Sequence, residues 1–388
     1  MSGDTAQEYF ADGMVEDITT ALARFKELFV IARNSTFVYK GRAVDIQQVA
    51  HELGVRYVLE GSVRKAGARL RITGQLIDAA TRAHLWADRF DGQVEDVFAL
   101  QDSITEQVLG ALLPTLQQAE IERTRRKPPA SLDAYDYVLR ALPMVIANTV
   151  AEAEPAARLL EEALRLSPEY AYAHALLAHA HGQLFRSAAG PARDQARAQA
   201  VIHARQALHL GADDGAVLAL AGFMLVVADK DIAGARAALD RAVALNPNSA
   251  TAFTYRALVL ALAGESEPGF ADAQRALRLS PLDPHRYLPH MAMLVGHFWR
   301  REYDEATAAG RRAIEIAPRY PMSYAWLIVV ESERGRVVEA ERLVQQLADV
   351  LPGFTRATLA NLFEIFPDSV ASHCIAALRS AGMIPAAP

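Results

Sequence analysis

The chain has 388 residues, of which 52% are hydrophobic and 22% are charged, and its formal net charge is −6. These values fit two domains, or one domain and a repeat array, and exclude a disordered tail. The acidic balance argues against a nucleic-acid binder, and the single cysteine, Cys374, excludes an intramolecular disulfide and a cysteine-based zinc site. The chain has neither a signal-peptide pattern nor a run of about 18 apolar residues, so we expect a cytoplasmic protein without membrane contact.

Residues 1–122 alternate between helix and strand patterns over short distances, which predicts a small α/β module. Three runs of alternating residues, separated by short polar links, predict an antiparallel meander within a short mixed sheet. A last helix is expected to begin at Val94 and to lead past Pro114 into a linker. The earlier expected elements are an amphipathic helix at 14–25, a strand at 28–32, a helix between Asp45 and Gly54, and strands at 55–60, 70–76 and 83–90.

The segment 123–132 is a basic and proline-rich linker. It contains Arg123, Arg125, Arg126 and Lys127, followed by two prolines. Such a cluster could contact phosphate groups, but paired prolines are more typical of a stiff, solvated hinge between domains.

Residues 133–352 repeat themselves. The segment ALRLSP at 163–168 recurs in related form, in steps of 44, 35, 34, 37 and 34 residues, as ALHLGA, AVALNP, ALRLSP, AIEIAP and LADVLP. Small or apolar residues stand twelve, eight and five positions before the closing proline, as at Ala156, Leu160 and Ala163 before Pro168. This spacing places small side chains on one helix face, where a neighbouring helix can approach closely.

Each unit therefore reads as a helix hairpin that needs its neighbours to bury its apolar face. In length and in its alanine and proline positions the array resembles the tetratricopeptide repeat, which implies an all-α superhelix, with capping helices and a tail at 353–388. Two departures are an insertion around Arg186 to Asp194 and a long loop in the first hairpin near Ala151 to Pro155.

In the tetratricopeptide family the first helix of each pair lines a concave groove. That resemblance implies an apolar groove suited to an amphipathic helix or an extended apolar peptide. The alternative is that the same side chains are inter-helix core. The residues concerned are Leu177, Met224, Leu258, Met291, Phe298 and Trp299.

The N-terminal part contains the segments EYFADGMVEDITTAL, FVIARNSTFVYKGRAVD and ELGVRYVLEGSVRKAGARLRITGQLIDAATRAHLWADRFDG. These segments resemble the TolB-like amino-terminal module of bacterial proteins. In that family the module lies between tetratricopeptide repeats and an upstream class III adenylate or guanylate cyclase domain or winged-helix domain. Relatives open with an apolar strand before the Met-Ser-Gly-Asp stretch, and this chain begins at Met1. We therefore expect that the first strand is missing, and that the start is internal to a longer protein or another segment completes the sheet.

No catalytic set accompanies these patterns. The chain lacks the sequence context of the cyclase aspartates, and it lacks both GxxxxGK[ST] and GxGxxG. Histidines at 174, 179 and 181 and at 285, 290 and 297 do not have the spacing of metal ligands, so we expect no metal and no cofactor.

One small-ligand site is conceivable at the end of the 28–32 strand, because ligands often bind at strand ends in α/β sheets. Its residues would be Arg33, Asn34, Ser35, Tyr39 and Lys40.

The sequence thus predicts a non-catalytic scaffold or regulatory protein that binds a protein or peptide segment in the repeat groove, with a homo-oligomer through the N-terminal module as an additional option. The alternative is the sensory portion of an adenylate cyclase-like signalling protein, in which case a cyclase label would be inherited from relatives. A third option is a small-molecule sensor that uses the N-terminal sheet.

Overall fold

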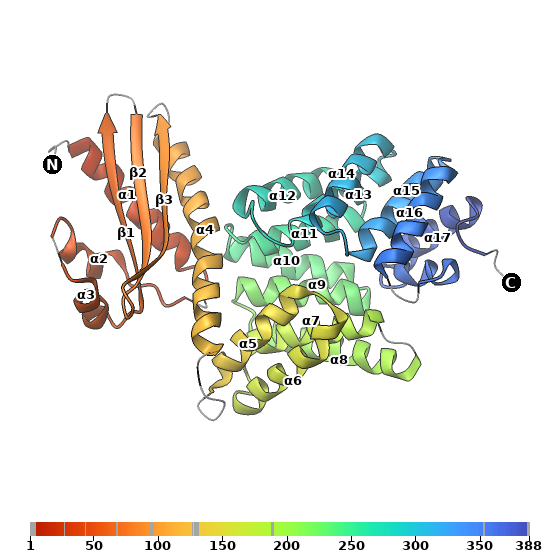
Figure 1. Cartoon of the computed structure of the whole chain (residues 1–388), viewed down its shortest axis with the longest axis horizontal. Helices are drawn as coiled ribbons and strands as arrows, with labels where there is room; N and C mark the ends of the chain where they lie inside the picture. Colours follow the sequence, from red (N-terminus) through yellow and green to blue (C-terminus); the bar gives the residue numbers. More distant parts are fainter. Residues whose placement is uncertain are drawn as a thin grey trace. The chain divides into compact units, whose positions relative to one another are not determined.

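The computed structural model describes residues 5–26, 28–42, 44–66, 69–93, 97–125, 127, 132–187, 190–351 and 354–385. The chain divides into two compact units, Met1–Arg126 and Lys127–Pro388 (Figure 1). None of the described helices combines the length and the apolar character that a bilayer span requires.

The first unit contains an antiparallel sheet of order β1-β2-β3, formed by β1 (Tyr57–Ala66), β2 (Arg69–Asp78) and β3 (Ala83–Gln93) (Figure 1). Gly61 pairs with Gly74, and the ring of Trp86 lies so close to Gly74 that a Cβ there would stand 3.0 Å from it. The predicted meander is confirmed.

The predicted strand at 28–32 is wrong: within the described residues this stretch has no strand partner, so the sheet has no parallel pair. Its apolar residues are used differently. Leu28 packs against Phe25 and Leu109, whereas Phe29 is 84% exposed. Because Leu28 packs into this core beside the helices, the segment does not join the sheet.

Two helices, α1 (Thr5–Leu22) and α4 (Val97–Arg125), pack on the apolar face of this sheet. Alternation along β2 sends every second side chain toward them, which is why this face is apolar. A shorter helix, α3 (Ile46–Leu53), begins where Asp45 accepts the backbone N–H of Gln47 at 2.9 Å and ends at Gly54 with φ 66°. The remaining short elements are α2 (Arg33–Thr36) and η1 (Phe37–Tyr39).

The linker prediction needs correction at its start, because α4 continues through Pro114 to Arg125. Arg123 is therefore a helical residue, and it donates to Glu120 at 2.7 Å. Its neighbour Arg125 pairs with Glu122 at 2.7 Å. Ion pairs one turn apart give these arginines partners within the helix.

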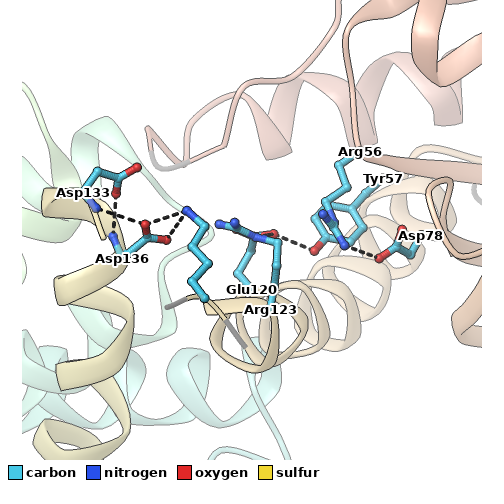
Figure 2. A network of polar contacts seen from close by, with 8 residues as sticks. Arg56, Tyr57, Asp78, Glu120, Arg123, Asp133 and Asp136 are labelled. Carbon is cyan, nitrogen blue, oxygen red and sulfur yellow. Dashed lines mark hydrogen bonds and ion pairs between the residues drawn. The ribbon is translucent and has the colours of Figure 1, made fainter. Parts of the chain in front are cut away.

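A polar network ties β1 to α4 (Figure 2). The Tyr57 hydroxyl donates to Glu120 at 2.7 Å, and Arg56 lies over the Tyr57 ring and pairs with Asp78 at 2.9 Å. Burial by itself raises the pKa of Glu120, but hydrogen bonds from Arg123 and Tyr57 outweigh it and leave that pKa below its usual range. Burial and the same hydrogen bond raise the pKa of Tyr57.

The described residues of the second unit form six antiparallel helix pairs and a C-terminal segment, which confirms the predicted tetratricopeptide-type superhelix (Figure 1). Gly264 and Gly335 turn two of the pairs with φ of 80° and 78°. The pairs are α5 (Ala134–Ala147) with α6 (Val150–Leu166), α7 (Ala171–Ser187) with α8 (Gly190–Leu210), α9 (Gly215–Asp229) with α10 (Ile232–Leu245), α11 (Ala250–Leu262) with α12 (Ser266–Leu279), α13 (Tyr287–Trp299) with α14 (Tyr303–Ile316), and α15 (Pro321–Glu333) with α16 (Val337–Val350).

Two expectations about the array change. The loop predicted near Ala151 to Pro155 is wrong, because α6 begins at Val150 and runs through Pro155 with Ala153 and Ala156 buried. The insertion predicted between Arg186 and Asp194 lengthens α7 and α8. After α16 the chain forms η3 (Arg356–Thr358), η4 (Ala360–Phe363) and α17 (Asp368–Ser380), so one helix and two short turns stand where two capping helices were expected.

The first helix of the array has a reciprocal cap (Figure 2). Asp133 accepts the backbone N–H of Asp136 at 2.8 Å, and Asp136 accepts that of Asp133 at 3.1 Å. Asp136 is fully buried and pairs with Lys127 at 2.6 Å. Burial by itself raises its pKa, but the Lys127 ammonium and these hydrogen bonds outweigh that effect and lower it.

We expect Asp136→Ala to lower the free energy of unfolding of the repeat unit by about 2 kcal/mol, because it leaves Lys127 unpaired and one cap incomplete. Because the folded pKa of Asp136 is lowered, its contribution is present above the unfolded pKa of about 3.9 and is lost as the pH falls through the folded value. Urea denaturation between pH 3 and pH 7 measures both effects. Glu154→Ala, in an exposed pair with Arg158, is the control, and equal losses in the two variants would contradict the assignment.

In the first unit, we expect Tyr57→Phe to lower the free energy of unfolding by about 1 kcal/mol, because one partly buried hydrogen bond to Glu120 is lost. Tyr39→Phe is the matched control, since the Tyr39 hydroxyl donates to Glu52 in an exposed pair. Thermal unfolding of both variants would show a lower melting temperature for Tyr57→Phe alone.

Candidate functional site

The side chains predicted to line the groove lie mostly in the core. Leu177, Met224, Met291 and Phe298 are exposed by 1%, 4%, 3% and 3%. They pack between helices, which is the alternative that the sequence left open. Of the predicted set, Leu258 and Trp299 are half-buried and keep some surface.

The end of the predicted groove is covered by the chain itself. His373 of α17 lies 5.6 Å from the ring of Phe298 and 5.1 Å from that of Trp299. Its Nε2 also stands 3.5 Å from a carboxylate oxygen of Glu333. A partner reaching Phe298 would have to displace α17.

A different set of aromatic rings lies along the first helices of three consecutive pairs. His179 of α7, Phe223 of α9 and Tyr255 of α11 are each half-buried. The rings of Phe223 and Tyr255 stack with centroids 4.3 Å apart, and His179 lies 6.3 and 5.9 Å from them. We call these three residues the aromatic strip.

The superhelix also brings residues of the first and fifth helix pairs together. His285, before α13, has its Nε2 2.7 Å from the backbone oxygen of Ile146 at the end of α5. Asn148 donates to the Tyr287 hydroxyl at 3.4 Å, across 139 residues of sequence. The first pair therefore contacts the fifth, because the array curves back on itself.

Arg186, Tyr255 and Tyr320 also belong to this region. We call Asn148, Arg186, Tyr255, Tyr287 and Tyr320 the inner cluster. Arg186 donates to the Asn148 side-chain oxygen at 2.8 Å. The rings of Tyr287 and Tyr320 lie 4.6 Å apart. No sequence pattern pointed to this set, because its members come from five helix pairs and share no spacing.

Burial shifts the pKa of one histidine and two tyrosines in this region. Burial lowers the pKa of His179 to about 4, with a smaller contribution in the same direction from Arg186. The His179 ring is therefore neutral at neutral pH, and its Nε2–H can donate to the Leu220 carbonyl oxygen 3.1 Å away. Burial also raises the pKa of Tyr255 and of Tyr287, so both hydroxyls stay protonated and can donate.

The N-terminal residues named as a small-ligand site do not converge. The side chains of Arg33 and Asn34 lie outside the described part of the structure, and Ser35 is exposed. Tyr39 donates to Glu52, and Lys40 pairs with Asp12 at 2.6 Å and lies 5.0 Å from the Phe37 ring centre. Tyr39 thus contacts α3 and Lys40 contacts α1, so both side chains have a structural role.

The histidines that the sequence grouped do not form a metal site either. His174 and His203 face each other with Nδ1 atoms 2.8 Å apart, and the ring of His181 stacks on that of His203 at 5.8 Å. Burial lowers the pKa of His203 to about 4. Among the described residues, no group of three or more His, Cys, Asp or Glu side chains is arranged to hold a metal ion.

No family model matches the chain. One curated relative, "Putative adenylate cyclase 3" of Rhizobium meliloti (strain 1021), is 48% identical over 177 residues. That match covers 46% of this chain and 30% of the relative, so the chain spans less than a third of the relative's length.

Solved structures similar to this chain include the human IFIT1 dimer with m7Gppp-AAAA, which is 15% identical and covers 98% of this chain and 82% of its own, with a TM-score of 0.51. Pseudomonas aeruginosa PilF is 22% identical over 57% of this chain and 93% of its own, with a TM-score of 0.38. Yeast Tom70 is 13% identical over 76% of this chain and 65% of its own, with a TM-score of 0.39. At these identities the likeness concerns the fold alone, a tetratricopeptide-type superhelix.

Proposed function

We propose that the chain is a non-catalytic interaction protein whose repeat unit binds a segment of a partner protein along the aromatic strip. The observation that supports this most directly is the set of half-buried rings on three consecutive first helices. Aromatic side chains that keep part of their surface exposed are typical anchors of protein interfaces.

The chemistry of the strip favours an apolar partner segment. His179 is neutral, and Phe223 and Tyr255 offer ring surface. Leu258, half-buried and one turn from Tyr255, extends the same apolar surface. An amphipathic helix or an extended apolar peptide could cover such a surface, whereas an acidic segment would find little charge on the strip itself.

A second function is favoured by the relative named as an adenylate cyclase. We propose that this chain corresponds to a regulatory portion of a cyclase-type signalling protein, in which a partner bound to the repeats would alter the activity of a catalytic domain. The segment shared at 48% identity supports this view. The absence of cyclase sequence motifs from this chain supports a regulatory role over a catalytic one.

Three further expectations stay predictions: a homo-oligomer through the N-terminal unit, no binding of nucleic acid, and a ligand at the N-terminal sheet. The boundaries of the functional domains at residues 122, 132 and 352 also stay a proposal. Their structural counterparts are the division at Arg126 and the end of α16 at Val350.

We expect Phe223→Ala to weaken binding of a partner, once one is identified with the full chain, by at least about tenfold, because one central aromatic anchor is lost. Isothermal titration with the purified partner measures the change. Phe223→Leu keeps most of the apolar volume and tests packing, and Val338→Ala, at an 86% exposed position on α16, is the control. If circular dichroism shows intact folding and all three variants bind as the unaltered chain does, the strip is not the interface.

We expect the purified chain to form no cyclic AMP from ATP in the presence of Mg²⁺ or Mn²⁺, because it lacks the cyclase aspartates and their sequence context. A chromatographic assay with a known cyclase as the positive control tests this. Cyclic AMP above the blank, if it co-purifies with the chain through two columns, would contradict the non-catalytic assignment.

A further inference from the structure

The outer edge of β1 is a long strand edge. The sheet has the order β1-β2-β3, so among the described residues β1 is paired with a strand on one side alone (Figure 1). Its register with β2 runs without interruption from Tyr57 to Ala66. Backbone N–H and C=O groups along the other side of β1 therefore point away from the sheet and can bind a further strand.

Proteins usually protect such an edge, and β1 has few protective features. A bulge, a proline or a set of charges commonly prevents strand addition. The other edge strand, β3, has an irregular register that skips Leu85, and it carries Asp88, Arg89 and Asp91. By contrast, β1 contains no proline and no bulge, and from Tyr57 to Val63 its one charged residue is Glu60. Of the two edges, β1 is the one open to strand addition.

The two faces of β1 restrict what can be added. Leu59 and Val63 are half-buried and pack against the core beneath α1 and α4. Ser62 and Arg64 are exposed on the opposite face, as the alternation along a strand requires. A neighbouring strand needs the same alternation in the same orientation. A second copy of β1, related by a two-fold axis perpendicular to the sheet, meets this condition and runs antiparallel to the first.

The charges of β1 also favour an identical strand. Glu60 and Arg64 stand two residues before and two residues after Ser62, so they lie on one face and have opposite signs. When two β1 strands pair antiparallel about Ser62, Glu60 of each copy is directly opposite Arg64 of the other. Side chains directly opposite each other in an antiparallel pair interact, and opposite charges there are stabilising.

Other registers lose these contacts. A shift in one direction places Glu60 opposite Ser62, and a shift in the other direction places Arg64 opposite Ser62. Within its own sheet Arg64 stands opposite Arg71, a like charge that is unfavourable at that distance. Arg71 pairs with Asp91 at 2.7 Å. A carboxylate on the outer side of Arg64 would offset the remaining repulsion.

We propose that two copies of this chain associate through β1, antiparallel about Ser62, to form one continuous sheet with three strands from each copy. Backbone hydrogen bonds between the strands provide the attraction, and the two Glu60–Arg64 contacts set the register. This assigns an interface to the expected homo-oligomer of the N-terminal unit and does not depend on the partner site in the repeats. A dimer would carry two repeat units, so a partner with two binding segments would gain avidity.

Sedimentation equilibrium of the full chain tests the association, and we expect a monomer–dimer equilibrium. Glu60→Arg and Arg64→Glu should each weaken the dimer by at least about tenfold, because each replaces two contacts between opposite charges by two between like charges. Arg89→Glu makes the same change of charge on the other edge strand and should leave the dimer unchanged. Circular dichroism checks that each variant is folded.

Mixing the two variants tests the register. Glu60→Arg has two cations at the β1 edge and Arg64→Glu has two anions, so a mixed dimer restores both opposite-charge contacts. We expect the mixture to associate about as strongly as the unaltered chain, although neither variant does so alone.

Three results would overturn the proposal: an unaltered chain that stays monomeric at every measurable concentration, a dimer that both variants leave intact, and folded variants whose mixture does not associate. A monomeric chain that binds an extended peptide along β1 would assign the edge to another protein instead. Binding of a partner at the aromatic strip should be the same for Glu60→Arg as for the unaltered chain, so the two proposals can fail separately.

Discussion

The close approach of neighbouring helices through small side chains is the constraint on which the repeat unit depends. Ala156, Ala235, Ala306 and Ala340 occupy the same position in four units, and each is 0% exposed. Larger side chains there would push the helices apart and alter the rotation from one pair to the next. At Gly310 even a methyl group would be too large, since a Cβ at that position would stand 2.6 Å from side-chain atoms of Leu294 and Leu327.

That rotation, accumulated over successive pairs, creates the inner cluster. Asn148 and Tyr287 are 139 residues apart and meet only because the array curves. Proteins built from helical repeats use concave surfaces for binding, and this array carries stacked aromatic rings on three consecutive first helices.

The N-terminal unit follows a different principle, in which one sheet face is apolar and is covered by α1 and α4. Its uncovered face is lined by polar pairs, with Ser62 2.8 Å from Thr73, Gln75 2.9 Å from Glu60, and Arg71 2.7 Å from Asp91. Antiparallel sheets commonly have one packed and one solvated face. The resulting alternation of apolar and polar residues along the strands is what predicted the meander. The resemblance to a TolB-like module remains an expectation for this unit.

The sequence by itself determined the elements whose causes are local. Proline and glycine positions marked the hairpin ends, period-two alternation marked β1 to β3, and the alanine spacing marked the superhelix, because each depends on neighbours along the chain. Local pattern failed at 28–32 and at 151–155, where an apolar run and a proline were compatible with more than one structure and packing chose between them. Tertiary structure alone decided which apolar residues of the first helices are core and which are surface, since Met224 and Phe223 are adjacent in sequence and differ in burial. It alone also assembled Asn148, Arg186, Tyr255, Tyr287 and Tyr320, because contacts over such separations depend on the accumulated rotation of the helix pairs, which no short pattern encodes.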